Sequence, residues 1–124
     1  MADILLVPTS GLGIITNRLK GAGTEPNYLA SGTGTTAPVN ANTTLETPRA
    51  EARVAGTSTQ QTTTLTNDTY RVVGTITYSS TAGAITEVGL FDNSSGGNLF
   101  LRGVFSPISV NPGDSIQFTC NVKF

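Results

Sequence analysis

The sequence predicts a mainly β fold: a small antiparallel β-sandwich or jelly-roll-like barrel with one short N-terminal helix and a long N-terminal loop region. Apolar and polar residues alternate with the two-residue period of strands through much of the second half of the chain. Charged residues make up 12% of the chain, which is about half the usual level. Thr, Ser, Asn and Gly fill the gap, and these residues suit strands and tight turns. We expect a single domain over residues 1–124, with a helix and extended segment over 1–50 and a β meander over 51–124.

The helix is expected over residues 10–20, because apolar side chains recur there at helical spacing. The apolar positions are Leu12, Ile15 and Leu19. Thr9 or Ser10 can cap the start, and Gly21 can take the positive φ that ends many helices. Glycines lie inside this helix of about three turns, so it would be marginally stable alone and must dock on another surface.

A long polar loop is expected between the helix and the second half of the chain. After a loop over residues 21–27, residues 28–31 have the composition of a short strand. Residues 32–48 are rich in Thr, Gly and Asn and have no clear period. Residues 32–36 superficially resemble a nucleotide-binding loop, but the third glycine is missing and an Ala-Pro pair follows in place of a helix. We therefore interpret residues 32–48 as a surface loop, and loops of this length are often functional.

The second half of the chain has several segments with strand periodicity. One long polar strand is expected over residues 50–66, ending at a turn at residues 67–68. Further strands are expected at residues 70–78, 84–91, 99–105 and 116–124. The loop over residues 92–98 and the turn over residues 111–114 are rich in Gly and Asx residues, and Pro107 lies in a connection. Short strands at this spacing indicate a small antiparallel sandwich or barrel.

The last of these strands has the clearest alternation. Its apolar face consists of Ile116, Phe118, Cys120, Val122 and Phe124. Its polar face consists of Gln117, Thr119, Asn121 and Lys123. A strand of this kind is half-buried, so Cys120 is expected to be a buried, inert thiol. Val73 and Val104 are expected to point away from the main apolar face, which leaves apolar surface for association.

The composition argues against catalysis. The chain has no histidine, which is the commonest general acid or base near neutral pH. The glutamates that an acid/base pair would need are Glu25, Glu46, Glu51 and Glu87. No pattern pairs any two of them, so all are expected to be solvated. Asp92, Asn93 and Asp114 lack the spacing of a calcium loop and are expected to shape turns. We expect no catalytic residue, no metal and no cofactor.

Charge and hydropathy exclude two classes of partner. The formal net charge is -1 and the 7 Lys and Arg residues are scattered, so no basic stripe is available to bind nucleic acid. The longest apolar run, residues 4–7, is far shorter than the roughly 20 residues that cross a bilayer. No secretory signal is recognisable. We therefore expect a soluble protein that is made in the cytoplasm and binds other proteins.

Several strings along the chain are distinctive. They lie at residues 28–37, 51–53, 66–70, 85–92, 96–98 and 113–118. The most specific are Ile-Thr-Glu-Val-Gly-Leu-Phe-Asp at 85–92 and the Gly-Asp-Ser that opens the closing strand. From about Gly11 to Phe124, the chain resembles a family of small tailed-bacteriophage virion structural proteins. The resemblance implies a non-enzymatic structural role, either as capsid cement (decoration) or in the tail, and it brings no catalytic residue to transfer.

Of these two roles we favour capsid cement, bound as a homo-oligomer to the major capsid protein on the outer surface of a phage head. A cement protein needs a compact body and an extended segment that crosses a subunit boundary, and residues 1–50 suit such a segment. A homotrimer would match the local threefold positions of a capsid shell. Residues 2–20 are expected to grip the particle or to dock on the protein's own sandwich. The candidate capsid or subunit contacts are Leu12, Ile15 and Leu19.

Two other functions remain open. A phage tail or tail-fibre subunit, with tail proteins as partners, would also be a β-rich homo-oligomer, although the chain has no coiled-coil or repeat segment to build a shaft. A carbohydrate-binding β module is a further alternative, although the absence of Trp and the presence of only 3 Tyr leave few aromatic platforms for sugar rings. In either virion role the protein would lie on the virion surface after synthesis in the cytoplasm of the bacterial host.

Overall fold

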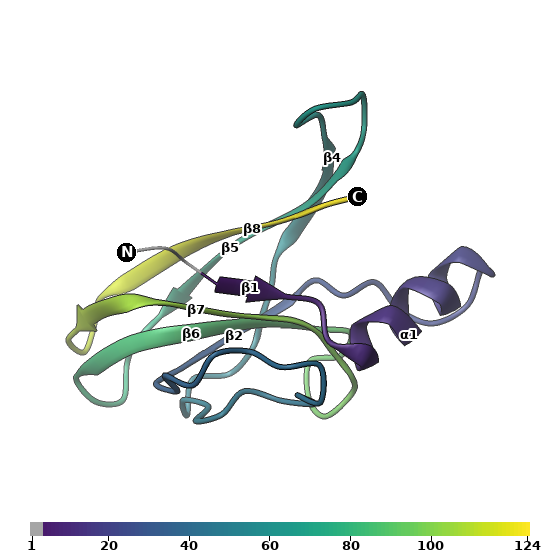
Figure 1. Cartoon of the computed structure of the whole chain (residues 1–124). Coiled ribbons are helices and arrows are strands. Elements are labelled where there is room, and N and C mark those ends of the chain that lie inside the picture. Colours follow the sequence, from purple (N-terminus) through teal and green to yellow (C-terminus); the bar gives the residue numbers. More distant parts are fainter. Residues whose placement is uncertain (1–3) are drawn as a thin grey trace.

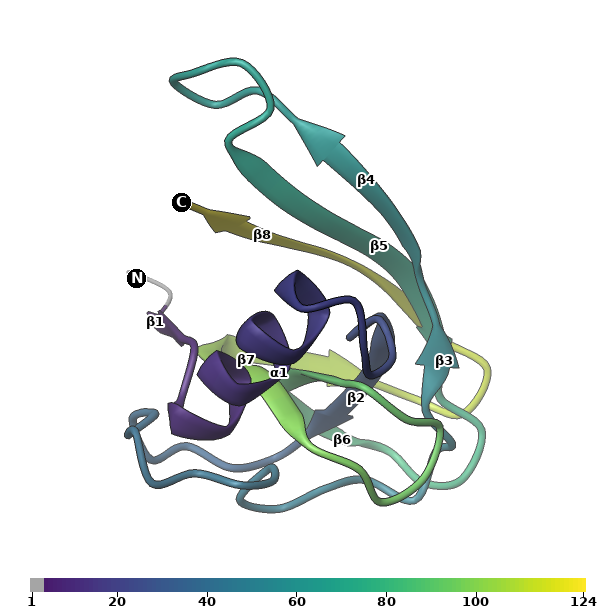
Figure 2. The same ribbon diagram turned by 90° about the vertical axis from the view of Figure 1, so that its right-hand side faces the viewer.

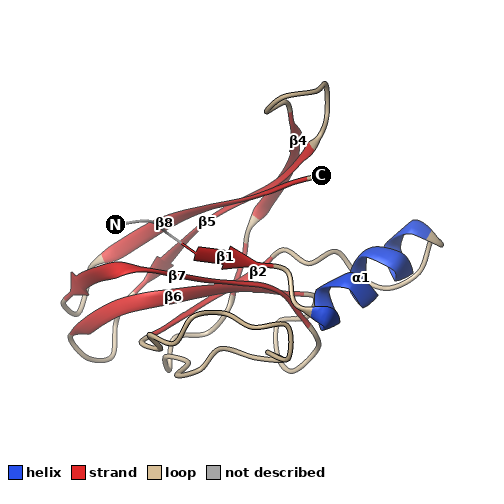
Figure 3. Cartoon of the chain, in the orientation of Figure 1, coloured by secondary structure: helices blue, strands red, loops and turns tan. Residues whose placement is uncertain are grey.

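The computed structural model describes residues 4–124 and consists of two antiparallel sheets with one short helix at their side (Figures 1 and 3). The elements in chain order are β1 (Ile4–Leu6), α1 (Thr9–Leu19), β2 (Tyr28–Gly32), β3 (Val54–Ala55), β4 (Thr57–Gln61), β5 (Thr69–Thr77), β6 (Gly83–Phe91), β7 (Leu99–Val110) and β8 (Ser115–Lys123). One sheet has five strands in the order β1-β7-β6-β2-β3, and the other has three in the order β4-β5-β8. The predicted mainly β sandwich with a short N-terminal helix is confirmed.

The chain crosses repeatedly between the two sheets. β6 and β7 form a hairpin, whereas β5 pairs along its whole length with β8, from Thr69 opposite Lys123 to Thr77 opposite Ser115. β5 and β6 therefore lie in different sheets, and so do β7 and β8. This order differs from a meander, in which each strand pairs with the next. β1 and β2, from the first half of the chain, pair with β7 and β6 in the five-stranded sheet.

The long strand expected over residues 50–66 is wrong, because the chain changes sheets within it. Val54–Ala55 pairs with β2, whereas Thr57–Gln61 pairs with β5 in the other sheet. Gly56 is the crossing point, and a side chain there would collide with those of Val72 and Leu29. The crossing therefore requires a glycine at this position.

The strand expected over residues 99–105 is too short, because Pro107 lies within β7 instead of in a connection. Ile85 of β6 faces Ile108 of β7, and Glu87 faces Val104. β7 therefore has more residues than β6 between these two pairs, and the register shifts there. Pro107 falls in the resulting bulge, where the missing N–H of proline disrupts no regular ladder. β1, which the sequence pattern did not predict, pairs with β7 just before this bulge.

The helix ends as predicted and begins differently. Gly21 has a φ of 85°, and its N–H donates to the carbonyl of Arg18 at 3.0 Å. At the start, Pro8 occupies the N-cap position and no side chain caps the helix. The Ser10 hydroxyl donates instead to the carbonyl of Leu99 on β7, at 2.7 Å. The expected cap is therefore replaced by a hydrogen bond that ties the helix to the sheet.

The core lies between the inner faces of the two sheets. It includes Leu29, Val72, Ile76, Tyr78, Ile85, Leu90, Leu101, Phe118 and Cys120. The alternation predicted for the last strand is confirmed, except that Phe124 is 69% exposed. Phe124 lies past the end of β8, where its N–H donates to the carbonyl of Asp68. Burial raises the pKa of the Cys120 thiol to about 11, which keeps it in the unreactive protonated form.

One end of the three-stranded sheet projects beyond the body of the protein as an arm, residues 57–72 (Figure 2). At its tip, the Asp68 carboxylate accepts hydrogen bonds from the N–H groups of Thr63, Thr64 and Leu65. These bonds hold the pKa of Asp68 well below its ordinary value. Asn67 takes a positive φ of 62° within this turn. The predicted turn at residues 67–68 is therefore confirmed.

The prediction that Glu87 is solvated is wrong, because its side chain is fully buried in the five-stranded sheet. Its carboxylate accepts hydrogen bonds from the N–H groups of Gly34 and Thr47, each at 2.8 Å, and of Glu46 at 3.0 Å. The Nε of Arg102, which is 1% exposed, donates to the same carboxylate at 2.9 Å. The long loop, residues 33–48, is thus fastened to the sheet at both of its ends by one side chain.

Burial disfavours the charged form of Glu87, but the bonds from Thr47 and Arg102 outweigh it and lower its pKa. The stability that the carboxylate supplies is therefore present above the ordinary glutamate pKa of 4.5 and is lost as the pH falls through the lower folded value.

We predict that Glu87→Gln lowers the free energy of unfolding by about 3 to 5 kcal/mol at pH 7, because it leaves Arg102 buried without a counter-charge. Urea unfolding followed by circular dichroism measures this change. The difference from the native protein should shrink at acid pH. Glu46→Gln is the matched control, since that carboxylate is exposed, and its effect should be much smaller. Equal effects of the two variants would contradict the importance of the buried pair.

Candidate functional site

The carboxylates that sequence reasoning considered for chemistry are engaged in separate structural contacts. The prediction that Glu51 is solvated is also wrong, because its side chain is only 5% exposed. It forms an ion pair with Arg49 at 2.8 Å and accepts a hydrogen bond from Ser80 at 2.6 Å. Burial opposes its ionisation, but these partners lower its pKa to about 2. Asp92 and Asp114 accept backbone N–H bonds within their own turns, as expected. Within residues 4–124 no cluster of acidic, Cys or His side chains is suited to hold a metal ion.

The segment that resembles a nucleotide-binding loop uses its N–H groups to bind carboxylates of this chain. The N–H of Gly34 donates to Glu87, and those of Thr35 and Thr36 donate to Glu46 at 2.9 and 3.2 Å. A phosphate would need these same donors. The bonds from Thr36 and Thr35 also lower the pKa of Glu46. The segment is thus held by internal carboxylates, and its N–H groups are already satisfied.

The helix docks on β7 through a face that the hydrophobic spacing did not identify. Gly11 and Ile14 are its buried residues. A side chain at Gly11 would collide with the carbonyl of Phe100, so glycine allows the helix to approach the sheet closely. A glycine inside a helix can indicate that the helix packs closely on another element, but an analysis of hydrophobic spacing does not take glycine into account.

The predicted contact residues of the helix lie mostly on its free side. Leu12 is 55% exposed and Leu19 is 82% exposed, whereas Ile15 is half-buried and packs at the edge of the core. Of the gripping region expected at residues 2–20, residues 2 and 3 lie outside the part that the structure describes. The helix therefore has one face on its own sheet and presents two large leucines to solvent.

Two grooves with largely apolar walls accompany these exposed side chains. One, of about 370 Å³, lies between α1 and the arm, and its lining includes Ile15, Leu19, Tyr70, Phe100 and Phe124. The other, of about 550 Å³, runs between β7 and β8 at an open edge of the sandwich. Its lining includes Leu5, Val104, Phe105, Ile108, Ile116 and Phe118. Apolar surface of this kind on a small protein marks contact with other proteins.

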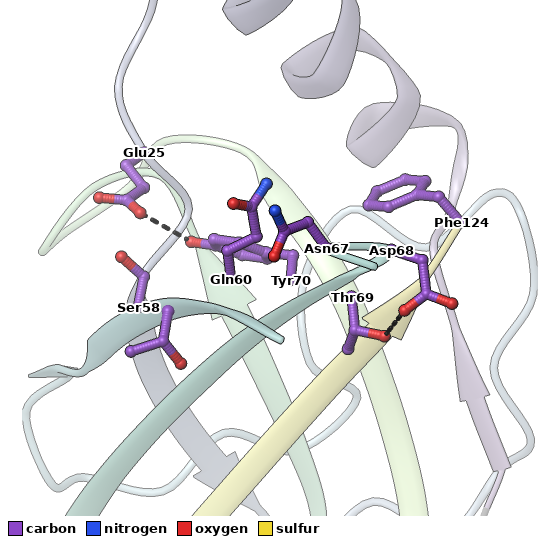
Figure 4. A pocket seen from close by; sticks show the side chains of 9 residues that line it. Glu25, Ser58, Gln60, Asn67, Asp68, Thr69, Tyr70 and Phe124 are labelled. Atoms are coloured by element: carbon purple, nitrogen blue, oxygen red, sulfur yellow. Dashed lines mark hydrogen bonds between the residues drawn. The ribbon is translucent and has the colours of Figure 1, made fainter. Parts of the chain in front are cut away.

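A third pocket, of about 340 Å³, lies along the inner side of the arm, and polar side chains and two aromatic rings contribute to its lining (Figure 4). Its walls come from the segment after the helix, from both strands of the arm and from the C-terminal residue. Sequence reasoning did not identify this pocket, because its residues are far apart in the chain and share no motif.

No helix within residues 4–124 has the length and apolar character needed to cross a bilayer.

Comparison with known proteins gives one family. Residues 16–122 match the family described as Podophage GP4 fiber I protein gp80. No significant match was found among curated proteins or among solved structures. The expected resemblance to phage virion structural proteins is confirmed at that level, and the description favours a fibre over capsid cement. The match spans most of the 124 residues. The chain therefore belongs to the podophage GP4 fiber I protein family, a family of non-enzymatic virion structural proteins.

Proposed function

We propose that the protein is a structural subunit of a podophage tail fibre, where it binds copies of itself and neighbouring tail proteins. The match of residues 16–122 to a fibre family carries this proposal. The capsid-cement role, with the major capsid protein as partner, receives no support from that match. A tail role requires the same physical property as a cement role, namely a compact β body with surfaces that bind other subunits.

The distribution of apolar surface supports self-association, and we assign it to the homotrimer expected from the sequence. The groove between α1 and the arm and the groove between β7 and β8 share no lining residue, although β7 contributes to both. When unlike surfaces of identical subunits meet, the contact is heterologous and closes into a ring if the rotation permits. The net charge of -1 produces little repulsion between copies. The chain has no coiled-coil segment through which its copies could associate. A closed ring would allow the β domains themselves to form the oligomer within the fibre.

The free side of α1 is the contact that we assign to this assembly. Leu12 and Leu19 would pack on a neighbouring subunit, with Ile15 at the margin of the contact. Leu19 and Ile15 also border the groove beside the arm, so the helix contact extends into that groove. Isolated exposed leucines are common, but two on one helix face beside an apolar groove favour a binding surface.

The trimer predicts a sedimentation equilibrium mass of about three times the 12.8 kDa of the chain at micromolar concentration. Replacing both leucines, Leu12→Ser and Leu19→Ser, should shift the protein toward monomer and leave its far-ultraviolet circular dichroism unchanged. Val39→Ser is the matched control, because Val39 is 52% exposed in the long loop. A native monomer would contradict the trimer, and a double variant that associates normally would contradict the helix contact.

The location on the virion is tested by labelling purified particles with gold-conjugated antibodies raised against this protein. Electron microscopy should place the gold on fibres at the tail. Gold distributed over the head shell would contradict the tail-fibre role and restore the capsid-decoration role.

A further inference from the structure

The pocket along the inner side of the arm combines polar side chains with exposed apolar surface, as small-molecule sites do. The side chains that give it chemical character are Glu25, Ser58, Gln60, Asn67, Tyr70 and Phe124. Gln60 and Tyr70 face each other across β4 and β5, so both lie on the inner side of the arm. Glu25 approaches from the segment after the helix, and Phe124 from the end of β8. Separate parts of the chain thus converge on one cavity.

Two carboxamides in this pocket are free to bind a ligand. Gln60 and Asn67 both line the pocket (Figure 4), and neither side chain has a hydrogen-bond partner among the described residues. Each carboxamide offers two N–H donors and one carbonyl acceptor. The turn that carries Asn67 is rigid, because Asp68 accepts three backbone N–H bonds in it and the hydroxyl of Thr62 accepts the N–H of Asn67. The backbone that carries Asn67 is therefore fixed before any ligand arrives.

Two aromatic rings complete the walls. The Tyr70 hydroxyl donates toward Glu25 at 3.3 Å and the carbonyl of Pro26 at 3.2 Å, and its ring packs edge-to-face on Phe100 at 5.9 Å. Phe124 is 69% exposed, although its N–H donates to the carbonyl of Asp68 at 2.9 Å. An ordered, exposed ring beside free polar groups suits a ligand that has both C–H faces and hydroxyl groups.

The lining also excludes other ligand classes. It contains no Lys or Arg, and the carboxylates of Glu25 and Asp68 would repel a phosphate, a sulfate or a carboxylate. A hydrocarbon would leave the carboxamides and hydroxyls without partners. The volume of about 340 Å³ is at the small end of the range for ligand sites. We propose that this pocket binds a neutral saccharide of one or two sugar rings.

This site goes beyond the proposed fibre role. It shares Tyr70 and Phe124 with the groove beside the helix, but its carboxamides, Gln60 and Asn67, do not line that groove. Titration of the ¹⁵N-labelled protein with glucose, galactose, rhamnose, N-acetylglucosamine and maltose, each followed by NMR, tests it. At least one sugar should shift the amide signals of Gln60, Asn67 and Tyr70, with a Kd of about 1 mM or tighter. If no sugar in this panel shifts these signals, the proposal is overturned.

A double variant, Gln60→Ala with Asn67→Gly, locates the binding. Glycine tolerates the positive φ of Asn67, so the turn should be retained while both carboxamides are removed. The affinity should fall by about tenfold or more, since each lost hydrogen bond removes part of the binding energy. Gln117→Ala is the matched control, because Gln117 is an exposed carboxamide on the outer face of β8.

Three outcomes of these measurements would overturn the site. The double variant could bind the sugar as tightly as the native protein, or the shifts could occur at other residues. The pocket signals could also shift on dilution without sugar, which would mean that a second copy of the chain covers the pocket. None of these outcomes affects the fibre role, which antibody labelling tests separately.

Discussion

The buried carboxylate of Glu87 is the interaction on which the first half of the structure depends. The loop over residues 33–48 forms no strand of its own and buries only one large apolar side chain, Leu45. Apolar burial alone therefore cannot fix its path. Glu87 supplies acceptors for N–H groups at both ends of the loop, and Arg102 balances its charge. The Nη1 of Arg102 also donates to Asn42 within the loop, at 3.3 Å, so both members of the ion pair hold it.

The second constraint is the unequal size of the two sheets. The three-stranded sheet extends past the five-stranded one as the arm, which leaves the sandwich open along its edges (Figure 2). The helix covers part of one opening, and the apolar grooves occupy what is left uncovered. In a monomer such openings cost stability, because they leave apolar surface in water. In a subunit of an assembly they become the surfaces on which neighbours pack, which agrees with membership of a fibre family.

Local pattern predicted most of the strands but not the way they combine. Sequence pattern identified β5, β6 and β8 within one or two residues. Alternation was clearest in β8, which has one face on the core, whereas β6 is buried on both faces. The sandwich was predicted, but the sheet to which each strand belongs could not be foreseen, since Gly56 marks one crossing and glycine carries no periodic signal. The burial of Glu87 was also missed, although a charge inside a continuous apolar strand is a sign that both faces are covered and that the charge is paired. For the candidate site the limits were similar. The spacing of apolar residues identified the face of the helix that is exposed to solvent. The face that docks on β7 contains Gly11, whose lack of a side chain allows close packing and leaves no hydrophobic signal in the sequence.

Native-state hydrogen exchange tests most directly whether Glu87 holds the long loop on the sheet. The amides of Gly34, Glu46 and Thr47 should exchange slowly in the native protein, because their N–H groups donate to the buried carboxylate. In the Glu87→Gln variant these three amides should lose protection before the paired amides of β5 and β8 do. If they exchange as fast in the native protein as the exposed turn at the tip of the arm, the carboxylate does not hold the loop and the account is contradicted.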